Sequence, residues 1–121
     1  MKIEIRNSNI HKMGVFCIED IFKDEIIEIC QLIILDENDT KIIDNTFLYN
    51  YYFSWKDDGS AICLGCGSLY NHSTKPKAKY IKDFENNKIT FIAIEDIKKD
   101  DEIFVNYNGT PDSDKKVWFE I

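Results

Sequence analysis

The side chains of this sequence that are best suited to chemistry are tyrosines and one asparagine–histidine pair. They stand at three places in the chain: Tyr49, Tyr51 and Tyr52, then Tyr70 with Asn71-His72, and then Tyr107. Each aromatic side chain alone is most simply explained as core filling. Taken together, the hydroxyl groups and aromatic faces suit a cation such as an ammonium or a sulfonium group. The set therefore favours a ligand or substrate that carries positive charge.

The cysteines offer a second kind of chemistry. Cys63 and Cys66 form a C-x-x-C pair, whereas Cys17 and Cys30 stand apart with a different spacing. A structural zinc site needs four ligands, usually supplied as two such pairs. Buried free thiols are therefore the favoured interpretation, and no metal is predicted. A zinc-dependent interaction domain built on Cys63 and Cys66 stays as a lower-ranked alternative.

Motifs of several common catalytic classes are absent from the sequence. It contains no G-x-S-x-G, H-E-x-x-H, G-x-x-x-x-G-K-[ST] or G-x-G-x-x-G pattern. These patterns mark serine hydrolases, zinc metalloproteases, P-loop NTPases and dinucleotide-binding folds. The chemistry must therefore rest on the tyrosines and amides.

Length and charge restrict the possible partners. The chain of 121 residues suits a single domain spanning 1–121. Its formal net charge of −7 argues against nucleic-acid binding and is compatible with a cationic partner. The N-terminus has no apolar export signal, and no apolar run approaches the ~18–20 residues of a membrane span. We therefore expect an intracellular protein of the cytoplasm, or of the nucleus if the source is eukaryotic or viral.

Short strands must position the tyrosines and the asparagine–histidine pair. Alternating or β-branched runs predict strands over 2–6, 14–18, 26–35, 78–81, 88–94 and 102–107. Polar turn clusters separate these runs, among them "ENDT" at 37–40 and "KDDGS" at 56–60. Residues 44–55 form either a short helical turn or an irregular aromatic-rich strand, and 68–78 is too polar for a strand. The predicted fold class is mainly β with little helix.

The sequence also contains one internal similarity. "CIEDIFKDEIIEI" at 17–29 and "AIEDIKKDDEIFV" at 93–105 share the pattern I-E-D-I-x-K-D in register. Two copies are too few for a repeat array. We expect two similar corners, in each of which a strand ends, a short polar turn follows and a new strand begins.

Taken in order, the segments resemble a minimal SET domain, the fold of protein-lysine methyltransferases that use S-adenosylmethionine. The matching segments are "IHKMGVFCIEDIFKDEIIE", "YNYYFSW", "LGCGSLYNHSTKPKA", "ITFIAIEDIKKDDEIFVNYNG" and the closing "VWF". The most specific part is Asn71-His72-Ser73 followed by a strand that ends in Tyr107. The sequence is most similar to stand-alone bacterial and viral members, which lack flanking modules. The resemblance implies several small sheets and a knot-like C-terminal arrangement.

The resemblance further implies a binding site for S-adenosylmethionine. Asn71 would hydrogen-bond the polar methionine end of the cofactor, and the backbone at His72 would meet its adenine. The loop at Gly14 would contact the cofactor through its backbone, and Trp118 or Phe119 would cover the adenine face. The residues implied to bind the cofactor are Lys12, Met13, Gly14, Asn71, His72, Tyr107, Trp118 and Phe119.

A catalytic tyrosine and a lysine channel are implied as well. Tyr107 matches the active-site tyrosine of the family, and Tyr51 or Tyr52 would line the channel for the substrate lysine. The implied reaction is methyl transfer to the side-chain amine of a lysine in a protein. A histone, a histone-like protein or a ribosomal protein would suit the acidic chain. Pairing of two copies could supply the support that flanking modules give elsewhere.

Four positions depart from the family pattern. Lys12 replaces the first glycine of a Gly-x-Gly, Lys77 replaces an asparagine, and aspartates occupy two corner positions where glycine is commoner, Asp24 and Asp100. Glycine commonly supplies a positive φ or a close approach of the backbone, so Lys12 bears directly on cofactor affinity. A second hypothesis is therefore a SET-type binding module that grips a lysine-rich peptide or the cofactor without turnover.

Overall fold

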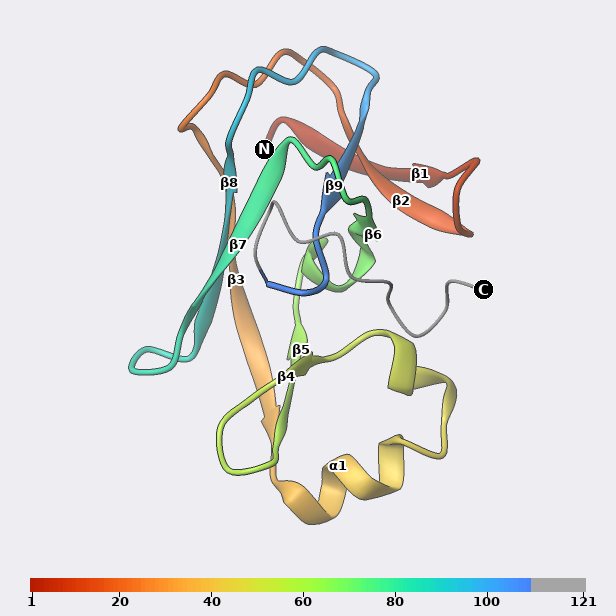
Figure 1. The fold of residues 1–121 in the computed structure, drawn as a ribbon, viewed down its shortest axis with the longest axis vertical. Helices are drawn as coiled ribbons and strands as arrows, with labels where there is room; N and C mark the ends of the chain where they lie inside the picture. The colour runs from red at the N-terminus through yellow and green to blue at the C-terminus, as the bar shows by residue number, and fades with distance from the viewer. Residues whose placement is uncertain (110–121) are drawn as a thin grey trace.

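The computed structural model describes residues 1–109, which form two small sheets with little helix (Figure 1). The four-stranded sheet has the order β1 (Ile3–Asn7), β2 (Met13–Cys17), β9 (Glu102–Val105) and β6 (Asn71–His72). The five-stranded sheet has the order β4 (Phe53–Ser54), β5 (Ser60–Cys63), β3 (Ile26–Leu35), β8 (Lys88–Ala93) and β7 (Ala78–Asp83). The helical elements are α1 (Glu37–Ile43), η1 (Phe47–Asn50) and η2 (Gly67–Leu69). The mainly β prediction is confirmed. The predicted C-terminal residues Trp118 and Phe119 lie outside the described residues.

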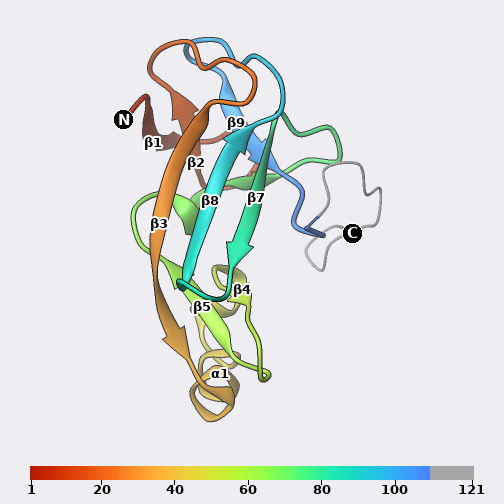
Figure 2. The same cartoon turned by 90° about the vertical axis from the view of Figure 1, so that its left-hand side faces the viewer.

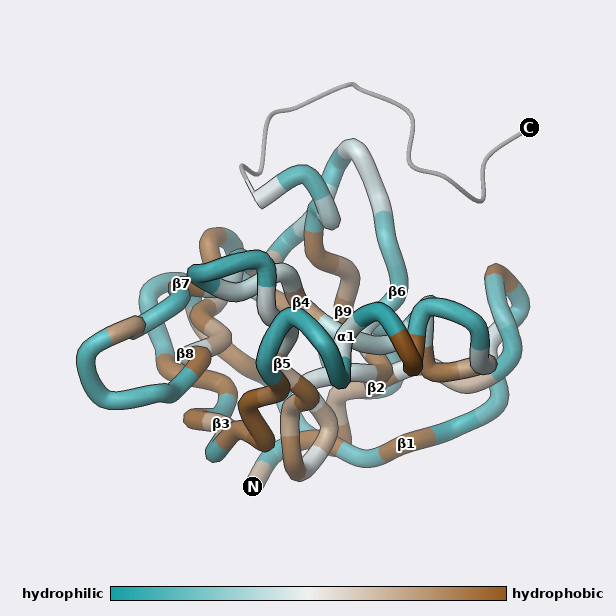
Figure 3. Tube along the Cα trace, turned by 90° about the horizontal axis from the view of Figure 1, so that it is seen from below, coloured by the Kyte–Doolittle hydropathy of each residue, from teal (hydrophilic) through white to brown (hydrophobic). Residues whose placement is uncertain are grey.

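Alternating burial explains why the predicted strands form. In β8, Ile89, Phe91 and Ala93 are fully buried while the residues between them are partly exposed. In β9, Ile103 and Val105 are fully buried in the same alternating way. Burying one face of each strand drives folding through the removal of apolar surface from water. Figure 3 shows the hydrophobic stretch carried by β3 and the hydrophilic start of α1.

The five-stranded sheet curls, so that its two edge strands approach each other. Its edges are β4 and β7, and Figure 2 shows the end of β7 close to β4. The Lys82 ammonium on β7 donates to the Ser54 carbonyl on β4 at 2.7 Å. The rings of Phe53 and Tyr80 lie 5.0 Å apart across the same seam. Side chains therefore bridge the gap between the two edge strands. A ligand can enter this gap only where the side chains leave a cavity.

The two corners that share a sequence pattern bind each other. Ile21 and Ile97 form a β-bridge, with N–H to carbonyl distances of 2.8 and 2.7 Å. Asp24 and Asp100 hold equivalent left-handed conformations, with φ of 72° and 71°. Each donates its N–H to the end of the strand that leads into the other corner, Asp24 to Ala93 of β8 and Asp100 to Cys17 of β2. Figure 1 shows the two loops together at one end of the molecule. The predicted pair of similar corners is confirmed, and the structure adds that they are mutual partners.

The prediction of a turn at 37–40 was wrong, because this segment begins helix α1. The Asp36 carboxylate caps the helix by accepting from the Asp39 N–H at 2.8 Å. The pair Glu37–Lys41, four residues apart, adds an ion contact at 3.2 Å. Asp at the N-cap and acidic residues in the first turn are start signals of a helix.

Within residues 1–109, no helix is long and apolar enough to cross a membrane.

Two further segments differ from the sequence interpretation. Residues 44–55 contain both of the structures that were considered, a short helix η1 and then strand β4. The polar segment 68–78 contributes strand β6, although it was expected to be too polar for a strand. Asn71 and His72 pair in parallel with Phe104 and Val105 of β9, and Ala78 at the end of the segment begins β7. Asn71 and His72 are both buried, so their polar side chains must bond within the protein.

Gly67 is predicted to be required by core packing. A Cβ atom at this position would lie 2.5 Å from the Cβ of Cys63 and 2.8 Å from the Sγ atoms of Cys30 and Cys63. We expect Gly67→Ala to lower the free energy of unfolding by about 1–3 kcal/mol, because overpacking forces the neighbours apart. Urea denaturation measures this, and Leu64→Ala at an exposed neighbouring site should change stability by less than about 1 kcal/mol. Equal stability of Gly67→Ala and wild type would contradict the prediction.

Candidate functional site

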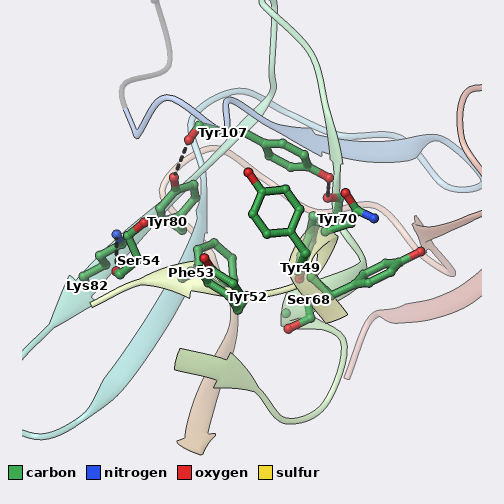
Figure 4. A pocket seen from close by; sticks show the side chains of 12 residues that line it. Tyr49, Tyr52, Phe53, Ser54, Ser68, Tyr70, Tyr80, Lys82 and Tyr107 are labelled. Atoms are coloured by element: carbon green, nitrogen blue, oxygen red, sulfur yellow. Dashed lines mark hydrogen bonds between the residues drawn. The ribbon is translucent and has the colours of Figure 1, made fainter. Parts of the chain in front are cut away.

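A pocket of about 240 Å³ lies at the seam between β4 and β7 (Figure 4). The sequence contains six tyrosines, and all six line this pocket. The complete lining is Tyr49, Asn50, Tyr51, Tyr52, Phe53, Ser54, Gly67, Ser68, Tyr70, Tyr80, Lys82 and Tyr107. Convergence of all the tyrosines from separate segments on one cavity is not explained by core filling. The pocket is therefore the candidate functional site.

Tyr107 follows β9 and is fixed at three points. Its hydroxyl donates to the Tyr70 carbonyl at 2.6 Å, and its N–H donates to His72 Nδ1 at 3.0 Å. Its own carbonyl accepts from the Tyr80 hydroxyl at 3.2 Å. Because the Tyr107 hydroxyl donates its proton to a carbonyl, its oxygen lone pairs can accept from a group in the pocket.

Burial raises the pKa of two tyrosine hydroxyls of the pocket, those of Tyr107 and Tyr80. It raises the pKa of Tyr107 well above the usual range, with a smaller contribution from Tyr51. It also raises the pKa of Tyr80 to about 12. These hydroxyls hold their protons at neutral pH, so they act as hydrogen-bonding groups and not as bases.

Tyr70 is anchored from behind by a buried carboxylate. Its hydroxyl donates to Glu28 Oε1 at 2.8 Å, and its ring stacks on Phe91 with centroids 4.2 Å apart. Glu28 is itself buried, and its Oε2 accepts from the Cys66 N–H at 3.4 Å. Burial, with the Glu28 charge as a further cause, raises the pKa of Tyr70. The Tyr70 carbonyl, which accepts from the Tyr107 hydroxyl, therefore belongs to a residue that is fixed at its ring and at its own hydroxyl.

Both tyrosines that were considered for the substrate channel line the pocket. The Tyr52 hydroxyl donates to Asp44 Oδ1 at 2.7 Å, and burial followed by this carboxylate raises the pKa of Tyr52 to about 12. The Tyr51 ring packs at 5.2 Å from that of Phe47. Tyr51 is the one of the two whose hydroxyl acts on the pKa of Tyr107.

The predicted cofactor loop forms a second cluster beside β6. The Asn71 amide nitrogen lies 3.1 Å from the His11 carbonyl, 3.0 Å from the Met13 carbonyl and 2.8 Å from Glu102 Oε2. A Cβ atom at Gly14 would overlap the Glu102 carboxylate. Asn71 therefore holds the loop in place, and Gly14 is glycine because the loop passes directly over a side chain.

Lys12 does not line the pocket, but it binds a residue next to it. Its φ of 40° lies in the left-handed region that glycine favours, so this chain reaches the conformation without glycine. Its ammonium lies 4.2 Å from the ring centroid of Phe47. Phe47 in turn contacts Tyr51, so Lys12 ties the loop to the aromatic wall of the pocket.

The predicted residues thus fall into three groups. Tyr51, Tyr52 and Tyr107 lie together in the pocket. Lys12, Met13, Gly14 and Asn71 form the neighbouring cluster, and His72 joins it to Tyr107 through a hydrogen bond. Trp118 and Phe119 are in the part of the chain that is not described.

Sequence reasoning missed Tyr80, Phe53 and Lys82 as pocket residues. Tyr80 and Lys82 stand two positions apart in β7, so they share one face of the strand. This spacing was visible in the sequence. The closing of the sheet that brings Phe53 against them was not.

The cysteines show no metal site in the described part of the chain. All four are free thiols, and Cys17, Cys30 and Cys63 are buried. Among residues 1–109, no group of three or more His, Cys, Asp or Glu side chains is placed to hold a metal ion. The zinc hypothesis has no ligand set within that range.

Comparisons with known proteins agree with this geometry. Residues 12–108 match the model of the SET domain family. The chain is 29% identical over 119 residues to a histone-lysine N-methyltransferase, H3 lysine-37 specific, of Schizosaccharomyces pombe, covering 98% of this chain and 77% of that protein. A crystal structure of a Plasmodium falciparum protein described as a histone methyltransferase has a TM-score of 0.72 at 36% identity, covering 90% of this chain and 99% of that one. A chain in a structure of ctPRC2 has a TM-score of 0.74 at 20% identity and covers 87% of this chain and 14% of that one, so it shares the fold.

The contact between Lys12 and Phe47 leads to a prediction about stability. We expect Lys12→Ala to lower the free energy of unfolding by about 0.5–1 kcal/mol, because it removes a cation from the ring face. Lys12→Arg should keep wild-type stability, and Lys12→Gly should fall between them because it relieves the positive φ. Urea denaturation of the three variants measures this. A Lys12→Ala protein as stable as wild type would show that the contact has no energetic value.

The raised pKa of Tyr80 leads to a prediction about alkaline stability. The unfolded chain loses this proton near pH 10, whereas the folded protein holds it up to about 12. The native state is therefore fully favoured below pH 10 and loses up to about 2 kcal/mol from this group as pH rises to 12. Denaturation of wild type and Tyr80→Phe at pH 9 and pH 11.5 should show a smaller loss in the variant. Equal losses would mean that Tyr80 titrates normally in the fold.

Proposed function

This chain belongs to the SET domain family of protein-lysine methyltransferases, and we propose that it transfers a methyl group from S-adenosylmethionine to the side-chain amine of a lysine in a protein. The observation that carries the proposal is the pocket lined by all six tyrosines, with Tyr107 fixed next to Asn71-His72. Such a pocket suits the sulfonium cation of the methyl donor, and its hydroxyl groups suit the amine of a lysine side chain.

The residues present fit S-adenosylmethionine. The aromatic and hydroxyl lining suits a positively charged sulfonium group, and at Gly14 a Cβ atom would meet the Glu102 carboxylate. Asn71, the backbone at His72 and the loop of Lys12, Met13 and Gly14 would hold the cofactor. When bound, the cofactor supplies a methyl group activated on sulfur.

The protein's own contribution is to position and desolvate the lysine amine. A free lysine has a pKa near 10.4, so the amine must lose a proton before it can attack, and the neutral tyrosines cannot take that proton. Water therefore receives it, helped by a partly apolar channel that disfavours the ammonium form. The Tyr107 oxygen and nearby carbonyl oxygens then orient the neutral amine. The amine would accept the methyl group in exchange for its bond to sulfur, and alignment by these residues would supply most of the rate enhancement.

The substrate that suits the chain is a lysine-rich protein. The net charge of −7 attracts basic proteins over long distances. The relatives from Schizosaccharomyces pombe and Plasmodium falciparum are described as histone methyltransferases. We therefore propose a histone or a histone-like protein as the substrate class, with a ribosomal protein as the alternative.

A second candidate function is binding without turnover. It was motivated by Lys12 in place of glycine, but Lys12 adopts a positive φ and binds Phe47 in the structure. Titration calorimetry with S-adenosylmethionine, followed by transfer of labelled methyl to core histones, separates the two functions. Micromolar or tighter binding with transfer supports catalysis, and the same binding without transfer to any lysine-rich protein supports the binding module. No binding of the cofactor would remove the basis of the main proposal.

Tyr107→Phe tests the catalytic role directly. We expect kcat to fall by about 10²-fold or more, because the hydroxyl oxygen that orients the amine is lost. Calorimetric affinity for S-adenosylmethionine and the thermal midpoint should change little, since the ring and its backbone bonds to His72 and Tyr80 are retained. Unchanged kcat would count against the role assigned to this hydroxyl.

A further inference from the structure

Lys82 places a positive charge in the wall of the pocket. Among the described residues that line the pocket, it is the one with a charged side chain. It stands on β7 two positions after Tyr80, so both side chains face the cavity. A positively charged side chain in the lining repels the positive charge of an incoming lysine. Its presence in a pocket that must admit a lysine therefore calls for a functional explanation.

Lys82 lies away from the reacting end of the pocket. Figure 4 shows its amine beside Ser54, on the opposite side of the cavity from the Tyr107 hydroxyl. The Tyr107 hydroxyl marks the reacting end, because it would orient the amine of the substrate lysine. The charge of Lys82 is therefore placed to meet residues that flank the target lysine and not the target amine itself.

The acceptor of Lys82 belongs to an open strand edge. Trp55 N–H bonds to the Gly59 carbonyl across the β4–β5 hairpin at 3.1 Å. Neighbouring residues of an antiparallel strand point their backbone groups in opposite directions, so those of Ser54 point away from β5. The Ser54 carbonyl accepts from Lys82 at 2.7 Å on that open side. The ammonium thus lies in the pocket wall beside the open edge of β4.

Lys82 is partly buried, and one protein acceptor faces its ammonium. Burial lowers the pKa of Lys82 from its ordinary value. An ammonium has three N–H donors, and the structure describes one acceptor for them, the Ser54 carbonyl. A carboxylate brought by a ligand would supply a further acceptor and the opposite charge.

We propose that Lys82 selects protein substrates with an acidic side chain close in sequence to the target lysine, and excludes those with a basic side chain there. The inference rests on the proposed function and specifies its substrate class. The acidic surface attracts a basic protein as a whole, while the local cation chooses which of its lysines enters the pocket. The preferred target is therefore a lysine next to aspartate or glutamate within an otherwise basic segment.

Binding of short peptides tests this selection independently of turnover. The probes are fluorescein-labelled peptides of alanine, glycine and serine with one central lysine. Glutamate, glutamine or arginine is placed in turn at each of the two positions on either side of that lysine. Affinities are measured by anisotropy in the presence of S-adenosylhomocysteine, and methylation of the same peptides is measured in parallel with labelled S-adenosylmethionine.

Wild type should bind the best glutamate peptide about five-fold or more tightly than its arginine counterpart. Lys82→Met should remove this preference, and Lys82→Glu should invert it at the same position. Lys79→Glu is the matched control, because Lys79 lies on the same strand but does not line the pocket, and it should keep the wild-type order.

An unchanged ratio in Lys82→Glu would overturn the selection and leave Lys82 as a structural tie to Ser54. If Lys82→Glu does not fold, Lys82→Met alone decides, since loss of the glutamate preference supports the proposal and its persistence overturns it. Inverted binding without any methylation would support the selection while contradicting the proposed catalysis. Methylation with an unchanged ratio would support catalysis and contradict the selection.

Discussion

The parallel pairing of β6 with β9 is the constraint on which the site depends. It joins Asn71-His72 to Phe104-Val105, and the Ser73 N–H extends the ladder to the Val105 carbonyl at 3.0 Å. This register sets His72 against the backbone of Tyr107 and Tyr70 against its hydroxyl. Slippage by one residue would turn Asn71 away from the loop that it holds. A strand of two residues thus fixes both the proposed catalytic hydroxyl and the proposed cofactor loop.

Buried polar groups carry much of the specificity around this pairing. Glu28, Asn71 and His72 are all buried, and each has bonds that only one arrangement of the strands can satisfy. A buried polar group without its partner costs more than the bond itself contributes, so these residues disfavour alternative packings. The tyrosine pocket is built against this framework. Its hydroxyls therefore have defined directions even before a ligand arrives.

Sequence reasoning predicted most of the strands and named three residues that line the pocket, Tyr51, Tyr52 and Tyr107, for identifiable reasons. Alternating burial in β8 and β9 follows from the period of a strand, which a sequence displays directly. The similarity of 17–29 to 93–105 revealed the corners but not their bridge, because partners distant in the chain leave no local signal. Strand β6 was missed since its pairing comes from tertiary position and not from apolar residues. The curl that brings Lys82 to Ser54 likewise depends on the whole sheet.

The mutual bridge of the two corners has a consequence for how the chain acquires its structure. Ile21 can find Ile97 only after nearly the whole described chain is available, and β2 can pair with β9 only then. Closing such long loops costs chain entropy before any contact repays it, and folding slows as contacts become less local. During synthesis the hairpin of β1 and β2 therefore cannot complete its sheet until β9 has emerged from the ribosome. Folding of this protein is therefore expected to be slow relative to helical proteins of similar size.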